Sequence, residues 1–301
     1  PIFIVGLPRT GTTILQHLLA EAGGARSPRM WELLYPAPPP DPARYDDDPR
    51  VARVARELAQ FHRLAPTTSK IHPLRADAPD ECLMLFNHAF ANFTAHTFGH
   101  IPSYHDWLWR QDMAPAYRFH RVQLQVLQRR VATTRWVLKA PQHMHALDAL
   151  LAVYPDACII QTHRDPGKTI PSICSLVGTT RQIYSRDRDM HRLGRRELEF
   201  WARGLDHAMA LRERGDGSRF FDVRYQQLVA DPVGVTRRVH EHFELPWRPG
   251  TEARLERFLS AYPQNAHGVH RYTAARFGLT DDVIGARLSR YRDAFSIARE
   301  S

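Results

Sequence analysis

The pattern of hydrophobic and polar residues predicts buried strands that alternate with amphipathic helices. Four short apolar runs have the length and composition of buried strands, at residues 2–5, 136–138, 157–160 and 220–223. Between the second and the third run, residues 147–154 carry apolar side chains at helical spacing. Strands that alternate with helices in this way are typical of an α/β fold, in which helices flank a parallel sheet.

A different pattern interrupts this alternation after the first predicted helix. The proline-rich stretch 36–42 can form neither a helix nor a central strand and must be a loop. Residues 50–65 and 79–95 then carry apolar residues at helical spacing, and the aromatic-rich stretch 104–109 stands at the start of another helix. We therefore expect one domain, residues 1–301, with a mainly helical insertion at about residues 31–130 that forms a layer over the sheet.

The first predicted strand runs into a loop suited to phosphate, GLPRTGTT at residues 6–13. The spacing of Gly6, Gly11 and Thr13 copies the loop of nucleoside-triphosphate enzymes, whose backbone N–H groups and following helix hold anionic groups. Thr12 stands where that loop carries lysine, which argues against a kinase or ATPase. The loop's cation is Arg9, which can grip phosphate or sulfate oxygens. The plainer alternative is an ordinary strand-to-helix turn.

A second pair of anion-binding residues follows the third predicted strand. The Arg164 guanidinium can donate two hydrogen bonds to one anion, and Ser172, about two helical turns later, supplies a hydroxyl donor. A nucleoside with phosphates at both ends would span the first loop and this pair. The alternative for Arg164 is an ion pair with Asp165 or another neighbour. Because ligand sites of parallel sheets lie beyond the carboxyl ends of the strands, Gly6, Lys139 and Arg164 should meet in one cleft.

Charge and cysteine content narrow the class of partner and the compartment. The chain has 41 basic and 32 acidic residues, a net charge of +9, which suits an anionic cofactor. Its basic residues are dispersed, so we expect no nucleic-acid partner. Cys82, Cys158 and Cys174 lack disulfide or metal-ligand spacing, which indicates reduced thiols in a cytoplasmic protein. No apolar run reaches the length of a membrane span, so we expect no transmembrane segment.

Taken in order, these motifs resemble the sulfotransferases that use 3'-phosphoadenosine-5'-phosphosulfate (PAPS). The likeness is closest to the bacterial, actinobacterial-type branch, with some likeness to the tyrosylprotein sulfotransferases. The matching segments extend over most of the chain: GLPRTGTT at 6–13, WVLKAPQHMHALDALLAVYPDA at 136–157, THRDP at 162–166, VRYQQLVADP at 223–232 and, more weakly, HRYTAARFGL at 270–279. The resemblance implies a P-loop-like fold and transfer of a sulfonate group from PAPS to a hydroxyl or amine, with 3'-phosphoadenosine-5'-phosphate (PAP) as product.

The resemblance also implies a role for each matching residue. Arg164 and Ser172 match the pair that binds the 3'-phosphate, and Tyr225 matches a tyrosine near the adenine. Lys139 matches a lysine that contacts the bridging oxygen and the transferring sulfonate, so Arg9 and Lys139 are the expected stabilisers of developing charge. The 5'-phosphosulfate site is matched by the loop residues Gly6, Pro8, Arg9, Thr10, Gly11, Thr12 and Thr13. The Arg-Lys-Gly triplet that clamps the 3'-phosphate in cytosolic relatives is missing, and its replacement is sought near His270, Arg271 or Tyr272.

The general base stays open among three residues. Glu81 corresponds to the glutamate of tyrosylprotein and heparan-type relatives, and His72 stands in a Lys-x-His setting like that of the cytosolic ones. His143, shortly after Lys139, is the third candidate. The structural alternatives are a helix first-turn carboxylate for Glu81 and a surface loop residue for His72.

The acceptor is also left open by the sequence. A hydroxyl on a small molecule, lipid, glycolipid, phenol or peptide fits. Aromatic residues of the insertion are candidates for an apolar acceptor pocket, although such residues are more often plain core: Phe90, Phe93, Tyr104, Trp107 and Trp109. Because sulfonate carries less charge than a phosphoryl group, we expect no metal. The alternatives to a sulfotransferase are a nucleotide-binding protein without transfer chemistry and an atypical kinase that lacks the loop lysine.

Overall fold

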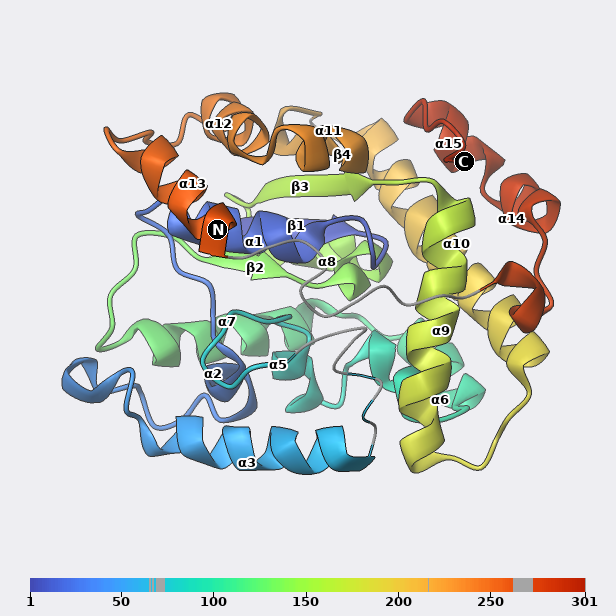
Figure 1. The fold of residues 1–301 in the computed structure, drawn as a ribbon, viewed down its shortest axis with the longest axis horizontal. Coiled ribbons are helices and arrows are strands. Elements are labelled where there is room, and N and C mark those ends of the chain that lie inside the picture. The colour runs from blue at the N-terminus through green and yellow to red at the C-terminus, as the bar shows by residue number, and fades with distance from the viewer. Residues whose placement is uncertain (65, 67, 69–73, 216, 262–272, 301) are drawn as a thin grey trace.

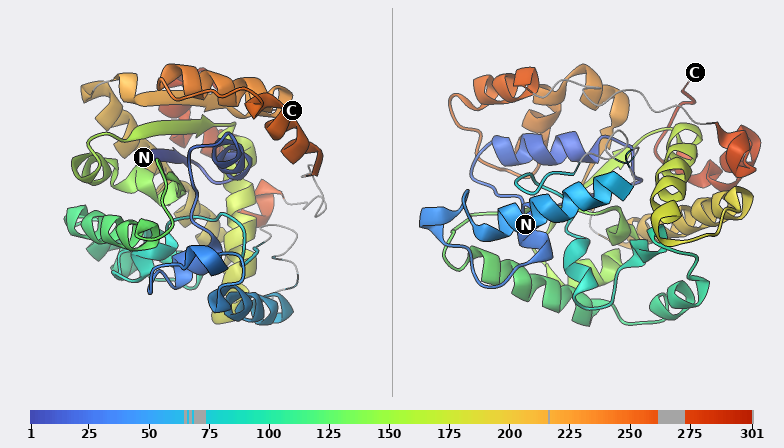
Figure 2. Two further views of the ribbon diagram at one scale, coloured as in Figure 1. Left: turned by 90° about the vertical axis from the view of Figure 1, so that its left-hand side faces the viewer. Right: turned by 60° about the horizontal axis from the view of Figure 1, so that its bottom comes forward.

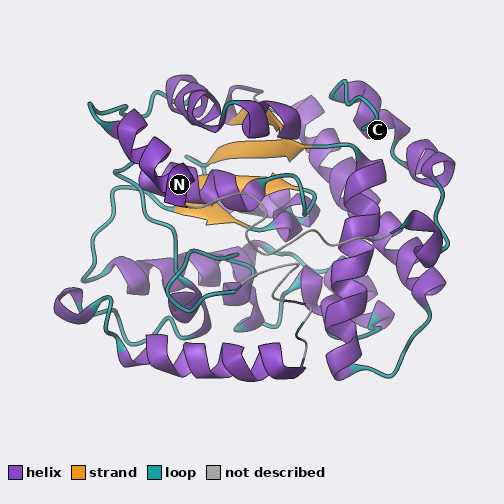
Figure 3. Ribbon diagram, viewed as in Figure 1, coloured by secondary structure: helices purple, strands orange, loops and turns teal. Residues whose placement is uncertain are grey.

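The computed structural model describes residues 1–64, 66, 68, 74–215, 217–261 and 273–300. At its centre four parallel strands pair in the order β2-β1-β3-β4, side by side in Figure 3. The strands are β1 (Ile2–Gly6), β2 (Val137–Lys139), β3 (Cys158–His163) and β4 (Phe220–Arg224). All four predicted strands and the parallel α/β class are confirmed. The third is longer than predicted because its polar residues Gln161, Thr162 and His163 pair with β4, opposite Asp222, Val223 and Arg224.

Helices cover both faces of the sheet, which explains why every residue of β1 is buried (Figure 2). Ile2 and Ile4 pack against the cluster on one face, and Phe3 and Val5 pack against the cluster on the other. Burial of each such side chain stabilises the fold by about 1.5–3 kcal/mol. The first face is covered by α1 (Thr12–Glu21), α11 (Tyr225–Ala230), α12 (Pro232–His242) and α13 (Thr251–Ala261). The second face is covered by α7 (Ala114–Gln128), α8 (Leu147–Val153), α9 (Pro166–Tyr184) and α10 (Met190–Arg214).

Between α1 and β2 the described elements are helical, as the sequence predicts for the insertion. They are α2 (Met30–Leu34), η1 (Pro42–Arg44), α3 (Pro49–Leu64), α5 (Met84–Asn87), η2 (Phe93–Thr97), α6 (Pro102–Leu108) and α7, where η marks a 3-10 turn. Helix α3 confirms the prediction for residues 50–65 and lies away from the strands in Figure 1. The division into one domain with an insertion stays a prediction.

The helical spacing of residues 79–95 predicts more α-helix than the structure has there. Only α5, four residues long, is α-helical there. Its start is displaced because the Cys82 N–H donates to the carbonyl of Lys139 at 3.0 Å, which ties this segment to β2. After α5, Phe90 takes a positive φ of 50°, which a continuous helix excludes. The pinned segment therefore keeps Glu81 at the end of β2.

The remaining elements bring the end of the described chain back to the sheet. Two short 3-10 turns, η3 (Pro141–His145) and η4 (Gly217–Arg219), follow β2 and α10. The end of the described chain forms η5 (Ala274–Phe277), α14 (Asp281–Arg287) and α15 (Ser289–Ala294), drawn in red in Figure 1. The ring of Phe295 then stacks on His163 of β3, with centroids 4.1 Å apart. The segment after α15 therefore lies at the carboxyl ends of the strands. Across the described ranges, no helix combines the length and the apolarity needed to cross a bilayer.

Candidate functional site

The loop between β1 and α1 has the backbone shape of an anion site. Gly6 has φ 130°, Gly11 has φ 86°, and between them Arg9 has φ 71°, which is unusual for a residue with a side chain. Gly11 precedes α1 and contributes no side-chain cap. Because the first N–H groups of a helix have no partner within the helix, this N-terminus can bind an anion.

Thr10 fixes the loop to the sheet. Its hydroxyl donates to the carbonyl of Leu7 at 2.6 Å and lies 2.6 Å from the hydroxyl oxygen of Thr162 on β3. Thr10 is buried, whereas Arg9 is exposed at the tip of the turn. The loop is therefore held at Thr10 and exposes Arg9, the residue before it.

Replacing Gly6 with alanine is expected to lower the free energy of unfolding by about 2–4 kcal/mol, because a side chain there meets both a clash and an unfavourable φ. A Cβ would lie 2.5 Å from Thr162 Oγ1 and 2.6 Å from its carbonyl oxygen. Gly24→Ala is the control: its φ is also positive, 77°, but the nearest atom would lie 3.8 Å away, so about 1 kcal/mol is expected. Denaturant unfolding measures both, and equal losses would contradict close packing of the loop on β3.

Arg164 joins the loop from the end of β3. Its Nη1 donates to the carbonyl oxygen of Arg9 at 3.2 Å, and its guanidinium carbon lies 3.9 Å from the centre of the Tyr225 ring. A Cβ on Gly11 would lie 3.3 Å from the same ring. The structure thus brings the loop, Arg164 and Tyr225 together at one edge of the sheet. The carboxylate that Arg164 contacts is Glu300, at 3.0 Å, and not Asp165.

Ser172 is buried inside α9. Within the described part of the chain, no hydrogen bond joins its hydroxyl to Arg164. That Ser172 and Arg164 bind the same phosphate group therefore stays a prediction.

Lys139 and Glu81 form an ion pair at the end of β2. The Lys139 side chain is 1% exposed, and its Nζ lies 2.8 Å from Glu81 Oε1. The Glu81 N–H donates to the carboxylate of Asp80 at 2.6 Å, and the side chain of Gln16 on α1 donates to the Asp80 carbonyl at 3.0 Å. Together with the bond from Cys82 to Lys139, these contacts fix Glu81 to both β2 and α1. Glu81 lies before α5 and is not part of its first turn.

Of the other two candidate bases, the structure describes His143. His143 is fully buried, with Nε2 3.2 Å from Cys82 Sγ and Nδ1 2.8 Å from the Tyr117 hydroxyl. Burial holds the pKa of His143 well below its ordinary value. His72 lies outside the described residues, as do the segment 270–272 and the lysine before His72. Among the described candidates, Glu81 is therefore the one that contacts Lys139.

His17 is a residue that the sequence reasoning missed. It lies on α1, where burial and the nearby positive charges of Lys139 and Arg75 lower its pKa to about 4. Its ring stacks on Phe258, with centroids 5.8 Å apart. A neutral imidazole therefore stands within electrostatic reach of Lys139 at neutral pH. A single histidine in an amphipathic helix gives no sequence signal for this position.

The predicted aromatic cluster divides into two groups. Phe93 and Trp109 line a cavity of about 350 Å³. Phe90 and Trp107 are 71% and 41% exposed, and the rings of both lie beside the Tyr104 ring, with centroids 5.2 and 5.7 Å away. Phe93 and Trp109 therefore belong to a cavity, whereas Phe90 and Trp107 belong to the protein surface.

Metal binding receives no support from side-chain positions within the described ranges. There, no three His, Cys, Asp or Glu side chains are grouped so that they could hold an ion. Metal independence stays a prediction.

Comparison with known proteins shows one consistent likeness. Residues 1–249 match the sequence profile described as the sulfotransferase family. The omega-hydroxy-beta-dihydromenaquinone-9 sulfotransferases Stf3 of Mycobacterium bovis and Mycobacterium tuberculosis are each 27% identical to this chain, over 97% of this chain and 74% of theirs.

Two crystal structures extend this likeness to the fold. Sulfotransferase STF1 from Mycobacterium tuberculosis H37Rv is 34% identical over 96% of this chain and 76% of its own, with a TM-score of 0.85. Sulfotransferase STF9 from Mycobacterium avium is 31% identical over 100% of this chain and 78% of its own, with a TM-score of 0.88.

Proposed function

The chain belongs to the sulfotransferase family and transfers a sulfonate group, and from this premise we propose that its donor is PAPS and its acceptor a lipid hydroxyl. The family match favours this function over a nucleotide-binding protein without transfer chemistry and over an atypical kinase. The observation that carries the donor proposal is the contact of Arg164 with both the Arg9 carbonyl and the Tyr225 ring.

The described residues fit a nucleotide with an anionic group at each end of its ribose. One anion site is the uncapped N-terminus of α1 with Arg9, and the other is the forked guanidinium of Arg164. Because Arg164 also donates to the loop, both sites belong to one edge of the sheet. Tyr225 adds a flat ring beside them, suited to a nucleoside.

Charge stabilisation is proposed for Lys139 and Arg9, and proton transfer for Glu81. The acceptor hydroxyl gives its proton to a Glu81 carboxylate oxygen as its own oxygen bonds to sulfur. The bond between sulfur and the bridging oxygen breaks, and its electron pair stays on the leaving phosphate. The Lys139 ammonium, 2.8 Å from Glu81, is proposed to stabilise that charge. No step requires a metal ion.

A lipid hydroxyl is proposed as the acceptor because Stf3 is named for a menaquinone-derived substrate. The exposed rings of Phe90 and Trp107 are consistent with an apolar acceptor. The test is transfer of labelled sulfonate to an omega-hydroxylated isoprenoid quinone in mixed micelles, with 4-nitrophenol as comparison. Faster labelling of the phenol would overturn the lipid proposal and leave the sulfotransferase assignment standing.

The donor proposal is tested by calorimetric titration with PAP, with ATP as the comparison and no metal added. Tight binding of PAP alone supports the proposal. Tighter binding of ATP than of PAP would overturn the proposal that PAPS is the donor.

Arg164→Ala is expected to weaken PAP binding by about thirtyfold or more, because a forked charge-assisted contact is lost. Glu81→Ala is expected to change it by less than about threefold, because Glu81 acts on the acceptor. Arg290→Ala, which breaks an exposed pair with Glu213, is the control and should leave binding unchanged. Equal losses for the Arg164 and Glu81 variants in the same titration would contradict this division of roles.

A further inference from the structure

Arg164, on which the proposed donor site depends, forms an ion pair with the carboxylate of Glu300. Arg164 Nε lies 3.1 Å from each carboxylate oxygen of Glu300, and Nη2 lies 3.0 Å from Oε2. The Gln226 side chain also donates to Glu300 Oε1, at 3.2 Å. This forked geometry is the one that arginine uses for carboxylates and phosphates alike. Glu300 therefore presents an anion to Arg164 as a phosphate would.

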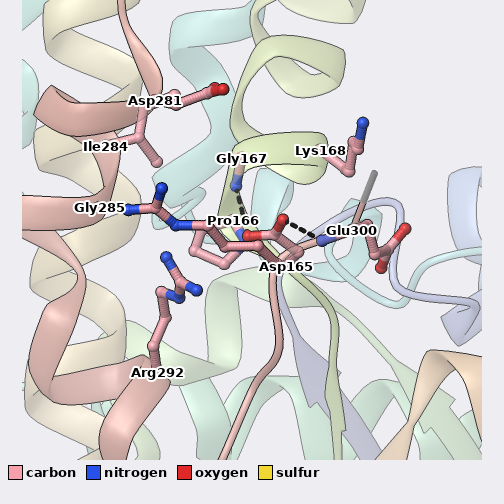
Figure 4. A pocket seen from close by; sticks show the side chains of 10 residues that line it. Asp165, Pro166, Gly167, Lys168, Asp281, Ile284, Gly285, Arg292 and Glu300 are labelled. Atoms are coloured by element: carbon pink, nitrogen blue, oxygen red, sulfur yellow. Dashed lines mark hydrogen bonds between the residues drawn. The ribbon is translucent and has the colours of Figure 1, made fainter.

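The segment that carries Glu300 is docked at both of its ends. The Glu300 N–H donates to Asp165 Oδ2 at 2.8 Å, and Asp165 also caps α9 (Figure 4). At the other end, the carbonyl of Phe295 accepts from Arg224 at 3.3 Å and its ring stacks on His163. Residues 295–300 thus cross the carboxyl ends of β3 and β4, so the carboxylate is held in place.

Glu300 and Tyr225 cover two different parts of the guanidinium. Glu300 holds its Nε and Nη2 edge, the Tyr225 ring covers one flat face at 3.9 Å, and the side chains of Arg164 and Glu300 are only 23% and 18% exposed. A second anion at this half-buried arginine would meet the negative charge of Glu300 at close range, and such repulsion is weakly screened. A phosphate can therefore take the Nε and Nη2 edge of Arg164 only if Glu300 leaves.

We propose that Glu300 is an internal competitor of the donor: its carboxylate holds Arg164 until the 3'-phosphate of a nucleotide displaces it. The inference rests on the proposed function, which takes Arg164 as the ligand of that phosphate. Donor binding is then an exchange of one anion for another. Nucleotides without a 3'-phosphate leave the pair intact and gain nothing from Arg164.

The test compares Glu300→Gln with the wild-type protein in calorimetric titrations with PAP and with AMP, which lacks the 3'-phosphate. Glutamine keeps the size of the side chain and removes its charge. The variant is expected to bind PAP about tenfold more tightly and AMP within about twofold of wild type. Glu213→Gln, which breaks the exposed pair with Arg290, is the matched control and should change neither affinity.

Three results separate failure of this inference from failure of the donor proposal. Unchanged or weaker PAP binding by Glu300→Gln, with a wild type that prefers PAP to AMP, overturns the role of Glu300 alone. Equal tightening for PAP and AMP also overturns it, because the effect would then be one of net charge. A wild type that does not distinguish PAP from AMP overturns the donor proposal itself.

Amide hydrogen exchange of the wild-type protein gives a second test that does not depend on a variant. Saturating PAP is expected to speed exchange at the Glu300 amide, whose N–H is bonded to Asp165, and AMP is expected to leave it unchanged. Undiminished protection in the PAP complex overturns the proposed displacement.

Discussion

Replacing Glu81 with glutamine is expected to lower the rate of sulfonate transfer about a thousandfold while PAP binds nearly as before. Glutamine keeps the length of the side chain and an oxygen that can accept from Lys139, but it cannot take the acceptor's proton. The rate is measured as labelled sulfonate transferred from PAPS to the omega-hydroxylated quinone, and binding is measured by titration with PAP.

Two controls separate catalysis from folding in this experiment. Because Lys139 is 1% exposed, a neutral partner leaves its charge less compensated, so the unfolding midpoint of the variant must be measured as well. If Glu81 and Lys139 act as one unit, Glu81→Gln combined with Lys139→Met should lose no more rate than the worse single variant. A Glu81→Gln rate within about tenfold of wild type would contradict the assigned base and direct attention to His72.

Acidification is expected to unfold the protein steeply between pH 6 and pH 5. Burial lowers the pKa of His17 to about 4 and the pKa of His105 and His120 to about 3. From these three rings alone, the unfolded chain, with histidine pKa near 6.5, binds about three more protons in this range than the folded one. Stability is fully present above pH 6.5 and falls by about 4 kcal/mol per pH unit below pH 6. Glu32, whose pKa burial raises, acts in the opposite direction but is a single group.

Denaturant unfolding at several pH values between 7.5 and 5 checks this expectation. His105→Gln should reduce the slope by about 1.4 kcal/mol per pH unit, because one buried titrating ring is removed. His191→Gln, at an exposed position, should leave the slope unchanged. A stability that does not vary between pH 7 and pH 5 would show that the buried rings can take up protons without unfolding.

The strands and the phosphate loop could be predicted because local sequence decides them. The apolar run before Gly6 is long enough for a buried strand and nothing else, and the spacing from Gly6 to Thr13 fixes a tight turn before a helix. The segment 79–95 shows where this fails. Its helical periodicity is real, but the bond from Cys82 to the Lys139 carbonyl outweighs it, and no local pattern reports a partner so distant in the chain.

The individual site residues were easier to predict than their partners. Glu81 and Lys139 were each singled out, yet they are 58 residues apart and only the folded chain shows their contact. Arg164 and Glu300 are 136 residues apart, and among so many charged residues no pattern selects that pair. Which long polar side chains pair depends on the path of the backbone, and that path cannot be inferred from the residues near either partner.

The attachment of Glu81 to both β2 and α1 has a consequence for redesign. Residues 80–82 are bound to the sheet and to the helix behind the phosphate loop, so they move with the donor half of the molecule although they stand within the insertion. A chimaera that exchanges acceptor preference should therefore join the foreign segment after Cys82 rather than at the start of the insertion. A junction before Asp80 would replace Glu81, the residue proposed to accept the proton.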